Sequence, residues 1–223
     1  MKKRFIICLL FTALLITSLS GCTSGSEFAT KYVQGALDAV YLAQFDAEYL
    51  ELLHDATAED LQSAYLATLE ERPDYFASYF DIAILTDEMR AELVELYREI
   101  YLHARYEVRG AEKTENGYLV EVVIEPIDIV QQVMEQDING YVDDFRSRYD
   151  AGEFATLSEE EYETEWAAGL IQLFQDRLDR IGYLTSHAVM VTVEPDPAQG
   201  ERSRIYQIPE ADMAAVDDCI IAY

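Results

Sequence analysis

The chain of 223 residues carries 43 Asp and Glu but only 16 Lys and Arg, which gives a net charge of −27 at pH 7. Half of its residues are hydrophobic and 16 are Tyr, a composition typical of a folded globular protein and not of an acidic disordered tail. The charge argues against a nucleic-acid partner, because phosphate binding requires clustered Lys and Arg, and it repels an anionic membrane surface.

The first 22 residues have the layout of an export signal. Met1 to Arg4 is basic, an almost unbroken apolar run extends from Phe5 to Leu19, and small residues precede Cys22. The apolar run is shorter than the ~20 residues that a transmembrane helix needs. The layout therefore predicts a cleaved signal peptide and not a membrane-spanning anchor.

The tetrapeptide Leu19-Ser20-Gly21-Cys22 resembles the lipobox of bacterial lipoproteins. The resemblance implies that diacylglycerol is attached to the Cys22 thiol and that cleavage then leaves Cys22 as the new N-terminus. Two acyl chains hold a protein stably on a bilayer. We therefore expect a signal peptide at 1–21, a lipidated tether at 22–27 and a single extracytoplasmic domain at 28–223, outside a bacterial cell membrane.

The cysteine count leaves one thiol in the predicted domain. Cys8 lies in the leader and Cys22 is the lipid site, so Cys219 has no partner for an internal disulfide. It follows Asp217 and Asp218, and acidic neighbours raise the pKa of a thiol. We interpret Cys219 as a small buried hydrophobic residue and not as a nucleophile.

The first half of the predicted domain has helical periodicity. Apolar residues recur at helical spacing from Phe28 to Phe45, and a shorter helix is predicted near 49–53. Thr57 and Thr86 are each followed by acidic residues, a pattern typical of an N-cap and a first helical turn. Residues 28–103 are thus predicted to be helical.

The period then changes to two, which predicts strands. The segments 105–108 and 118–124 flank Glu115-Asn116-Gly117, and Asn-Gly tolerates the positive φ of a tight hairpin turn. A second hairpin is predicted from 187–193 and 202–208. The former is apolar at nearly every position, so we expect it in the middle of the sheet.

Two helices are predicted between these hairpins. One apolar stripe runs from Ile127 to Tyr149. Ser158 and Glu161 have the spacing of a capping box, which opens a helix that we expect to end at Gly182.

Together these elements predict an α+β fold. It has a helical N-terminal half and a roughly four-stranded antiparallel sheet, made of two hairpins that flank a helical pair. Pro209 is expected to open a last short helix that ends near Cys219.

Four short segments carry a resemblance to a known group of proteins. They are Tyr32-Val33, Leu37-Asp38-Ala39-Val40-Tyr41, Phe45-Asp46-Ala47-Glu48-Tyr49 and Glu125-Pro126-Ile127-Asp128. The chain resembles uncharacterised lipoproteins of Gram-positive, clostridia-like bacteria that contain a domain of unknown function. The resemblance implies a surface lipoprotein without an assigned activity, and it transfers no functional residue beyond Cys22.

The sequence contains no recognised catalytic or metal-binding motif. G-x-S-x-G, H-E-x-x-H, P-loop, C-x-x-C and EF-hand patterns are all missing. The three histidines, His54, His103 and His187, are far apart in the sequence. We therefore predict no enzymatic activity, no cofactor and no metal site.

Acidic pairs are the remaining candidates for catalysis. Asp143 with Asp144 and Glu163 with Glu165 are interpreted as solvated helix faces, which a chain this acidic must contain. The alternative is a carboxylate-dependent hydrolase that acts on cell-envelope material, which would need two carboxyl groups converging in a pocket.

The tyrosines of the helical half are the candidates for ligand binding. Aromatic faces stack on ligands and the hydroxyl adds a polar group, so Tyr41, Tyr75, Tyr79 and Tyr97 are predicted to line a cleft between the helices and the sheet. The other interpretation is a core edge with hydroxyls that reach water.

We expect a membrane-anchored binding module whose partner is an envelope protein or a small ligand. It would be held to the membrane through Cys22. A structural or assembly subunit is a third possibility, which an exposed apolar patch would indicate.

Overall fold

The computed structural model describes residues 25–53, 56–196 and 205–223. The leader, Cys22 and His54 lie outside these ranges, as does most of the link between the two strands of the predicted second hairpin.

The N-terminal half is helical, as predicted. Its helices are α2 (Gly25–Leu42), α3 (Ala47–Leu53), α4 (Ala58–Glu70), α5 (Arg72–Tyr79) and α6 (Asp87–Tyr101). The start of α2 at Gly25 makes the end of the predicted tether helical. Both predicted caps are confirmed, since Thr57 accepts a hydrogen bond from Asp60 N (3.2 Å) and Thr86 accepts one from Met89 N (3.3 Å).

The sheet has four antiparallel strands in the order β1-β2-β3-β4, which confirms the predicted fold class. The strands are β1 (Arg105–Lys113), β2 (Tyr118–Glu125), β3 (His187–Pro195) and β4 (Tyr206–Gln207). β3 lies inside this order, as expected. The short strand β4 pairs only with Glu194 and Pro195, the last two residues of β3. Helix α10 (Glu210–Ile220) satisfies one backbone donor on the part of β3 that β4 does not cover, because Asp212 Oδ2 accepts the Thr192 N–H at 2.7 Å.

The first hairpin was predicted correctly, but for the wrong reason. Neither Asn116 nor Gly117 has a positive φ, and the turn closes through a hydrogen bond from Thr114 N to Gly117 O (2.9 Å). A Cβ on Gly117 would lie 2.1 Å from the carbonyl oxygen of Val193. The glycine is needed because the neighbouring strand passes so close to it.

The predicted continuous helix from Ile127 to Tyr149 is interrupted. The segment consists of α7 (Ile129–Gln132), the π-helical turn η1 (Val133–Asp137) and α8 (Ile138–Asp150). Arg177 holds this turn through two 2.7 Å hydrogen bonds from Nε and Nη2 to the Asp137 carboxylate. A contact distant in sequence therefore accompanies the irregularity, which periodicity alone could not reveal.

The second helix of the pair, α9 (Glu159–Gln175), begins with the predicted capping box of Ser158 and Glu161. The prediction that it extends to Gly182 is wrong, because a 3-10 turn, η2 (Leu178–Arg180), follows it. The Gly182 N–H donates to Asp128 Oδ1 (2.9 Å), and a Cβ there would lie 2.7 Å from Asp128 Oδ2. Gly182 thus permits the Asp128 side chain to approach the backbone closely, and it does not terminate the helix.

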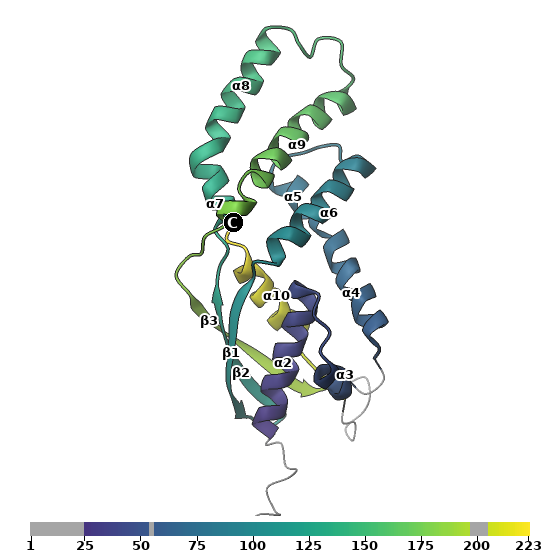
Figure 1. The fold of residues 1–223 in the computed structure, drawn as a ribbon, viewed down its shortest axis with the longest axis vertical. Coiled ribbons are helices and arrows are strands. Elements are labelled where there is room, and N and C mark those ends of the chain that lie inside the picture. Colours follow the sequence, from purple (N-terminus) through teal and green to yellow (C-terminus); the bar gives the residue numbers. More distant parts are fainter. Residues whose placement is uncertain (1–24, 54–55, 197–204) are drawn as a thin grey trace, which may run out of the picture.

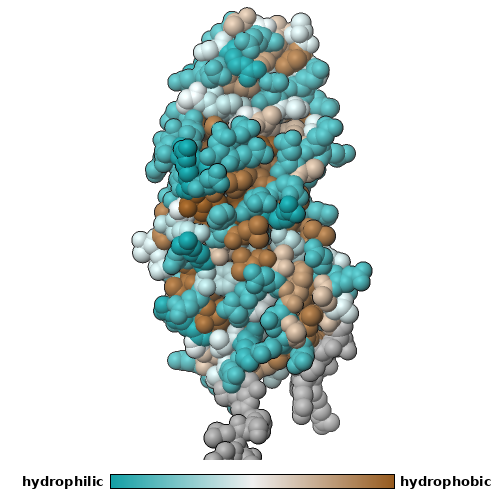
Figure 2. Space-filling model, in the orientation of Figure 1, coloured by the Kyte–Doolittle hydropathy of each residue, from teal (hydrophilic) through white to brown (hydrophobic). Residues whose placement is uncertain are grey.

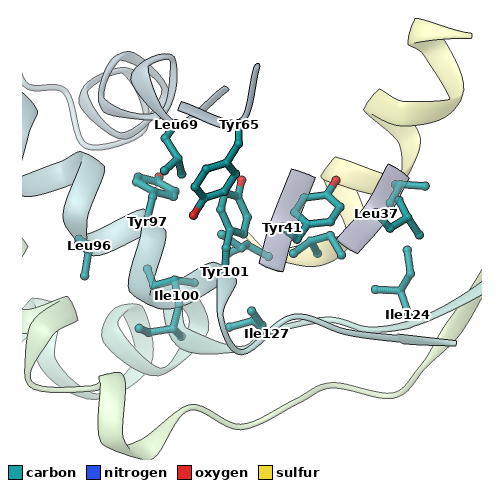
Figure 3. Packing of buried hydrophobic residues seen from close by; sticks show 14 of the residues in the cluster. Leu37, Tyr41, Tyr65, Leu69, Leu96, Tyr97, Ile100, Tyr101, Ile124 and Ile127 are labelled. Atoms are coloured by element: carbon teal, nitrogen blue, oxygen red, sulfur yellow. The ribbon is translucent and has the colours of Figure 1, made fainter. Parts of the chain in front are cut away.

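The elements form an elongated molecule with α2 and α10 packed over one face of the sheet (Figure 1). The side chains of β2 that face these helices, Val120, Val122 and Ile124, are fully buried. Helices α4, α5 and α6 extend the core beyond the sheet, and Figure 3 shows tyrosines from α2, α4 and α6 packed among its aliphatic side chains. The α8–α9 hairpin protrudes at the end opposite to the start of α2 (Figure 1).

Candidate functional site

The four tyrosines predicted to bind a ligand lie in two different environments. Tyr41 and Tyr97 are buried, whereas Tyr75 and Tyr79 are exposed. Three of them meet at Tyr223: the hydroxyls of Tyr97 and Tyr223 are 2.7 Å apart, and the rings of Tyr75 and Tyr79 lie 4.8 and 5.2 Å from its ring centroid. The gap among the described residues beside Tyr97 leaves no space for a water molecule.

Tyr41 belongs to a separate polar network inside the core. Its hydroxyl donates to Asp217 Oδ1 (3.3 Å), and Arg72 donates to both oxygens of the same carboxylate at 2.7 and 3.0 Å. The guanidinium of Arg72 also lies 5.5 Å from the ring centroid of Tyr101. Among the described residues, its Nε has no hydrogen-bond partner. Burial and then the Asp217 charge raise the pKa of Tyr41 above its ordinary value, so the phenol stays protonated.

A cleft of about 460 Å³ lies elsewhere, between the end of α5 and the α8–α9 hairpin. This volume is in the range of small-molecule sites. Five aromatic side chains line it: Phe80, Phe145, Tyr149, Tyr162 and Trp166. Figure 2 shows that hydrophobic surface on one face gathers mainly in the middle of the molecule, while the tip of the hairpin is largely hydrophilic.

The aromatic rings of the cleft stand at large angles to one another. Phe145 is buried, and its ring makes angles of 73° with Trp166 and 68° with Tyr162, at centroid distances of 5.1 and 5.4 Å. Tyr149 is 61% exposed and makes an angle of 76° with Tyr162. These pairs are edge-to-face contacts, which aromatic quadrupoles favour, and they surround the hollow with rings in several orientations.

Helical spacing and a glycine together position these rings. Tyr162 and Trp166 are four residues apart on α9, so they share one face of that helix. Tyr141 stacks behind Trp166 at 5.0 Å and donates a 2.6 Å hydrogen bond to its carbonyl oxygen. A Cβ on Gly169 would lie 2.3 Å from the Tyr141 ring. Gly169 therefore lets α8 approach α9 closely enough to support Trp166.

Two carboxylates and one guanidinium also line the cleft. Asp81 follows the end of α5 with a φ of 54°, and the Ile82 N–H bonds back to Ala77 O at 2.9 Å, as in a Schellman motif. Asp81 thus occupies a left-handed position that usually holds Gly or Asn. It also places a negative charge at the negative end of a helix dipole.

Glu163 lies on α9, and its carboxylate contacts the backbone of the segment that follows α5. Its Oε2 accepts a 2.9 Å hydrogen bond from the Ala83 backbone N–H. Arg146 on α8 is the cation of the lining, but its side chain is 69% exposed and lies 3.7 Å from Asp143 Oδ1. The lining is therefore aromatic and carries a net negative charge.

Sequence reasoning did not identify this site. It assigned Glu163 to a solvated helix face and the aromatic residues of 141–166 to the apolar stripes of two helices. One signal was present: Trp166 is the single tryptophan of the chain, and it lies four residues after Tyr162. What the sequence lacked was the position of Phe80 and Asp81 relative to these helices.

The described residues show neither a candidate metal site nor an activated thiol. Among them, no three His, Cys, Asp or Glu side chains gather in a way that could hold a metal ion. Cys219 is a free, half-buried thiol, and burial followed by the Asp218 charge raises its pKa. This raised pKa does not favour a nucleophilic thiolate. Each described helix is too short or too polar to serve as a transmembrane span.

The sequence matches no protein-family model and no curated protein. Among solved structures, the fold is similar to the crystal structure of YcdA from Bacillus subtilis, which is described as a "putative lipoprotein". The TM-score is 0.58 at 12% sequence identity, over 87% of this chain and 56% of that chain. The two proteins share a fold. This chain spans little more than half the length of YcdA, and at this identity the likeness concerns the fold alone.

Proposed function

We propose that the protein is a membrane-anchored extracytoplasmic lipoprotein that binds a small ligand in the aromatic cleft of the α8–α9 hairpin. The observation that carries the proposal is the open hollow of about 460 Å³, lined by five aromatic rings. Aromatic side chains that line a cleft are typical of binding sites, because their faces offer a large apolar area for contact with a ligand.

The lipobox and the shape of the molecule support the cellular part of the proposal. Acylation of Cys22 would hold the start of the chain at the bilayer. The hairpin lies at the end of the molecule opposite to the start of α2 (Figure 1). An anchor that precedes α2 would thus leave the hairpin at the end of the molecule far from the membrane, where a ligand in the envelope could reach it. The shared fold with YcdA, described as a "putative lipoprotein", is consistent with this assignment.

The anchor is tested by replacing the acylated thiol. We expect the full-length protein expressed in a Gram-positive host to fractionate with membranes and to carry a diacylglycerol mass on Cys22. Cys22→Ser should abolish both properties, and Cys219→Ser should retain both. A native product without acyl chains, or a Cys22→Ser variant that remains on membranes, would contradict the anchored assignment.

Ligand binding is tested with the intrinsic fluorescence of Trp166. We expect fractions of small molecules extracted from a Gram-positive cell envelope to change its emission. Tyr149→Ala should weaken this response at least tenfold while changing the free energy of unfolding by no more than about 0.5 kcal/mol, because Tyr149 is largely exposed. If no fraction changes the emission, or if the response survives Tyr149→Ala unchanged, the cleft is not a binding site.

A carboxylate-dependent hydrolase is the second candidate, since Asp81 and Glu163 line the same cleft. Binding is favoured because the Glu163 carboxylate already accepts the Ala83 N–H, a contact that general acid catalysis would disturb. Turnover of wall-derived glycans by the purified protein, lost in both Asp81→Asn and Glu163→Gln, would establish the hydrolase instead.

A further inference from the structure

We infer that the occupant of the aromatic cleft is a small organic cation with a quaternary or substituted ammonium group. This inference rests on the proposed function and specifies the ligand class for the same site. It is drawn from three features of the cleft: the mutual angles of its rings, the charges of its lining and the backbone position of Asp81.

The ring angles favour a compact group over a flat one. A flat ligand, such as a sugar ring or a second aromatic group, is best held on one platform or between two parallel rings. Here Phe145 makes angles of 73° with Trp166 and 68° with Tyr162, and Tyr162 makes 76° with Tyr149. Rings in several orientations suit a roughly spherical ammonium group. Such a group is attracted to each ring face that it contacts by the negative face of the ring quadrupole.

The charged side chains of the cleft also favour a cation as the ligand. Asp81 and Glu163 line the cleft together with Arg146, so the carboxylates outnumber the cation. The Arg146 side chain is largely exposed and its Nη1 lies 3.7 Å from Asp143 Oδ1, so solvent and this carboxylate screen its charge. The whole chain carries a net charge of −27, so its long-range field attracts cations and repels anions.

The position of Asp81 departs from local structural preference. Asp is one of the few residues besides glycine that tolerate a φ of 54°, so the departure lies in its charge, because the end of a helix favours a cation. An aspartate at this position adds its charge to the partial negative charge of the last carbonyl groups of α5. Residues that depart from local preference concentrate at functional sites. A bound cation would interact favourably with both the carboxylate and these carbonyl groups.

The experiment compares choline with 3,3-dimethylbutan-1-ol, an uncharged molecule of nearly the same shape. Both are titrated into the purified full-length protein, with Trp166 emission and calorimetry as readouts and the ionic strength held constant. We expect choline or tetramethylammonium to bind at least tenfold more tightly than the alcohol. Choline affinity should fall as salt is added, because screening weakens the attraction of exposed charges.

Substitutions that remove one charge at a time test how the charges of the lining contribute to binding, without disturbing the backbone. Asn tolerates positive φ, so Asp81→Asn keeps the turn, and the Glu163→Gln amide can still accept the Ala83 N–H. We expect each to weaken choline binding three- to tenfold and to leave binding of the alcohol unchanged. Arg146→Gln should strengthen choline binding about two- to fivefold. The control Glu112→Gln, on strand β1 away from the cleft, should change neither.

The outcomes separate this inference from the proposed function. If the alcohol binds as tightly as choline, or if Arg146→Gln abolishes binding, the ligand is not selected as a cation and the inference fails. If neither compound binds but an envelope fraction still changes Trp166 emission in a Tyr149-dependent manner, the inference fails and the proposed binding function stands. If nothing binds, both fail.

Discussion

The tyrosine network of the helical core and the aromatic cleft of the hairpin contain the same residue types in opposite roles. In the core, the Tyr41 hydroxyl, Arg72 and Asp217 bond to one another, and Tyr97 bonds to Tyr223. In the cleft, aromatic rings line an open hollow and the carboxylate of Asp81 is exposed.

The difference shows that aromatic content alone does not indicate a binding site. Polar groups that are paired within the protein stabilise the fold, because their desolvation is compensated by internal partners. A site needs groups that are held in position while part of their binding capacity remains open. The predictions below separate these two roles by experiment.

The largest expected effect is alkaline unfolding of the tyrosine core. Burial, followed by nearby carboxylates, raises the pKa of Tyr41, Tyr101 and Tyr106 above the ordinary 10.0. Because the folded-state pKa exceeds the unfolded-state value, the stabilisation is complete below pH 10 and is lost as the pH rises above it. Each such tyrosine removes about 1.4 kcal/mol per pH unit in that range.

This is measured by following phenolate absorbance and circular dichroism together as the pH is raised. A late group of the 16 tyrosines should ionise only with the loss of the helical signal. If all of them ionise while the protein remains folded, the core network is more open than its geometry indicates.

The next effect concerns the ion pair of the core. Asp217→Ala should lower the free energy of unfolding by about 3 kcal/mol, because it leaves Arg72 without its carboxylate in a largely buried position. The two side chains are only 17% and 27% exposed. Urea denaturation measures the change.

The matched control is Asp74→Ala, which removes an ion pair from the same helix as Arg72. The Asp74 carboxylate is 2.6 Å from Arg90, but its side chain is 68% exposed, so the cost should be below about 1 kcal/mol. Equal costs for the two variants would contradict the structural role assigned to Asp217.

Removing single hydroxyls compares the two regions most directly. Tyr97→Phe should lower the free energy of unfolding by about 1 kcal/mol, since it breaks the 2.7 Å bond to Tyr223 in a buried setting. Tyr149→Phe in the cleft should change it by less than about 0.5 kcal/mol. Thermal melting of both variants measures this difference, and a larger effect at Tyr149 would reverse the comparison.

The smallest effect concerns the cap of the helix that carries Trp166. Backbone and side-chain hydrogen bonds from Ser158 lower the pKa of Glu161 below its ordinary 4.5. Because the folded-state pKa is lower than the unfolded-state value of 4.5, this stabilisation is complete above that unfolded-state value. It is lost as the pH falls through the lower folded-state pKa. Glu161→Gln keeps an acceptor for the cap but removes the titration.

We therefore expect the melting temperature to fall less steeply in Glu161→Gln than in the unmodified protein between about pH 5 and 3. Trp166 emission reports the transition. Parallel pH profiles for the two proteins would show that the capping carboxylate does not contribute to acid sensitivity.

The sequence by itself determined the fold class and the ends of several helices. The caps at Thr57, Thr86 and Ser158 were predictable because each depends on a hydrogen bond to a residue three positions away. The change of period from helix to strand was equally local. So was the first hairpin, although the reason assigned to its glycine was wrong.

Tertiary structure alone decided where the tyrosines lie and where the cleft forms. The same side chain is buried at Tyr97 and exposed at Tyr149, and spacing within a helix does not say which neighbour will cover it. Gly117 and Gly182 are needed because distant segments pass close to them. The cleft exists because the end of α5 meets α8 and α9, which lie more than fifty residues later in the chain. Such long-range packing depends on the shape of the whole core and not on any local pattern of residues.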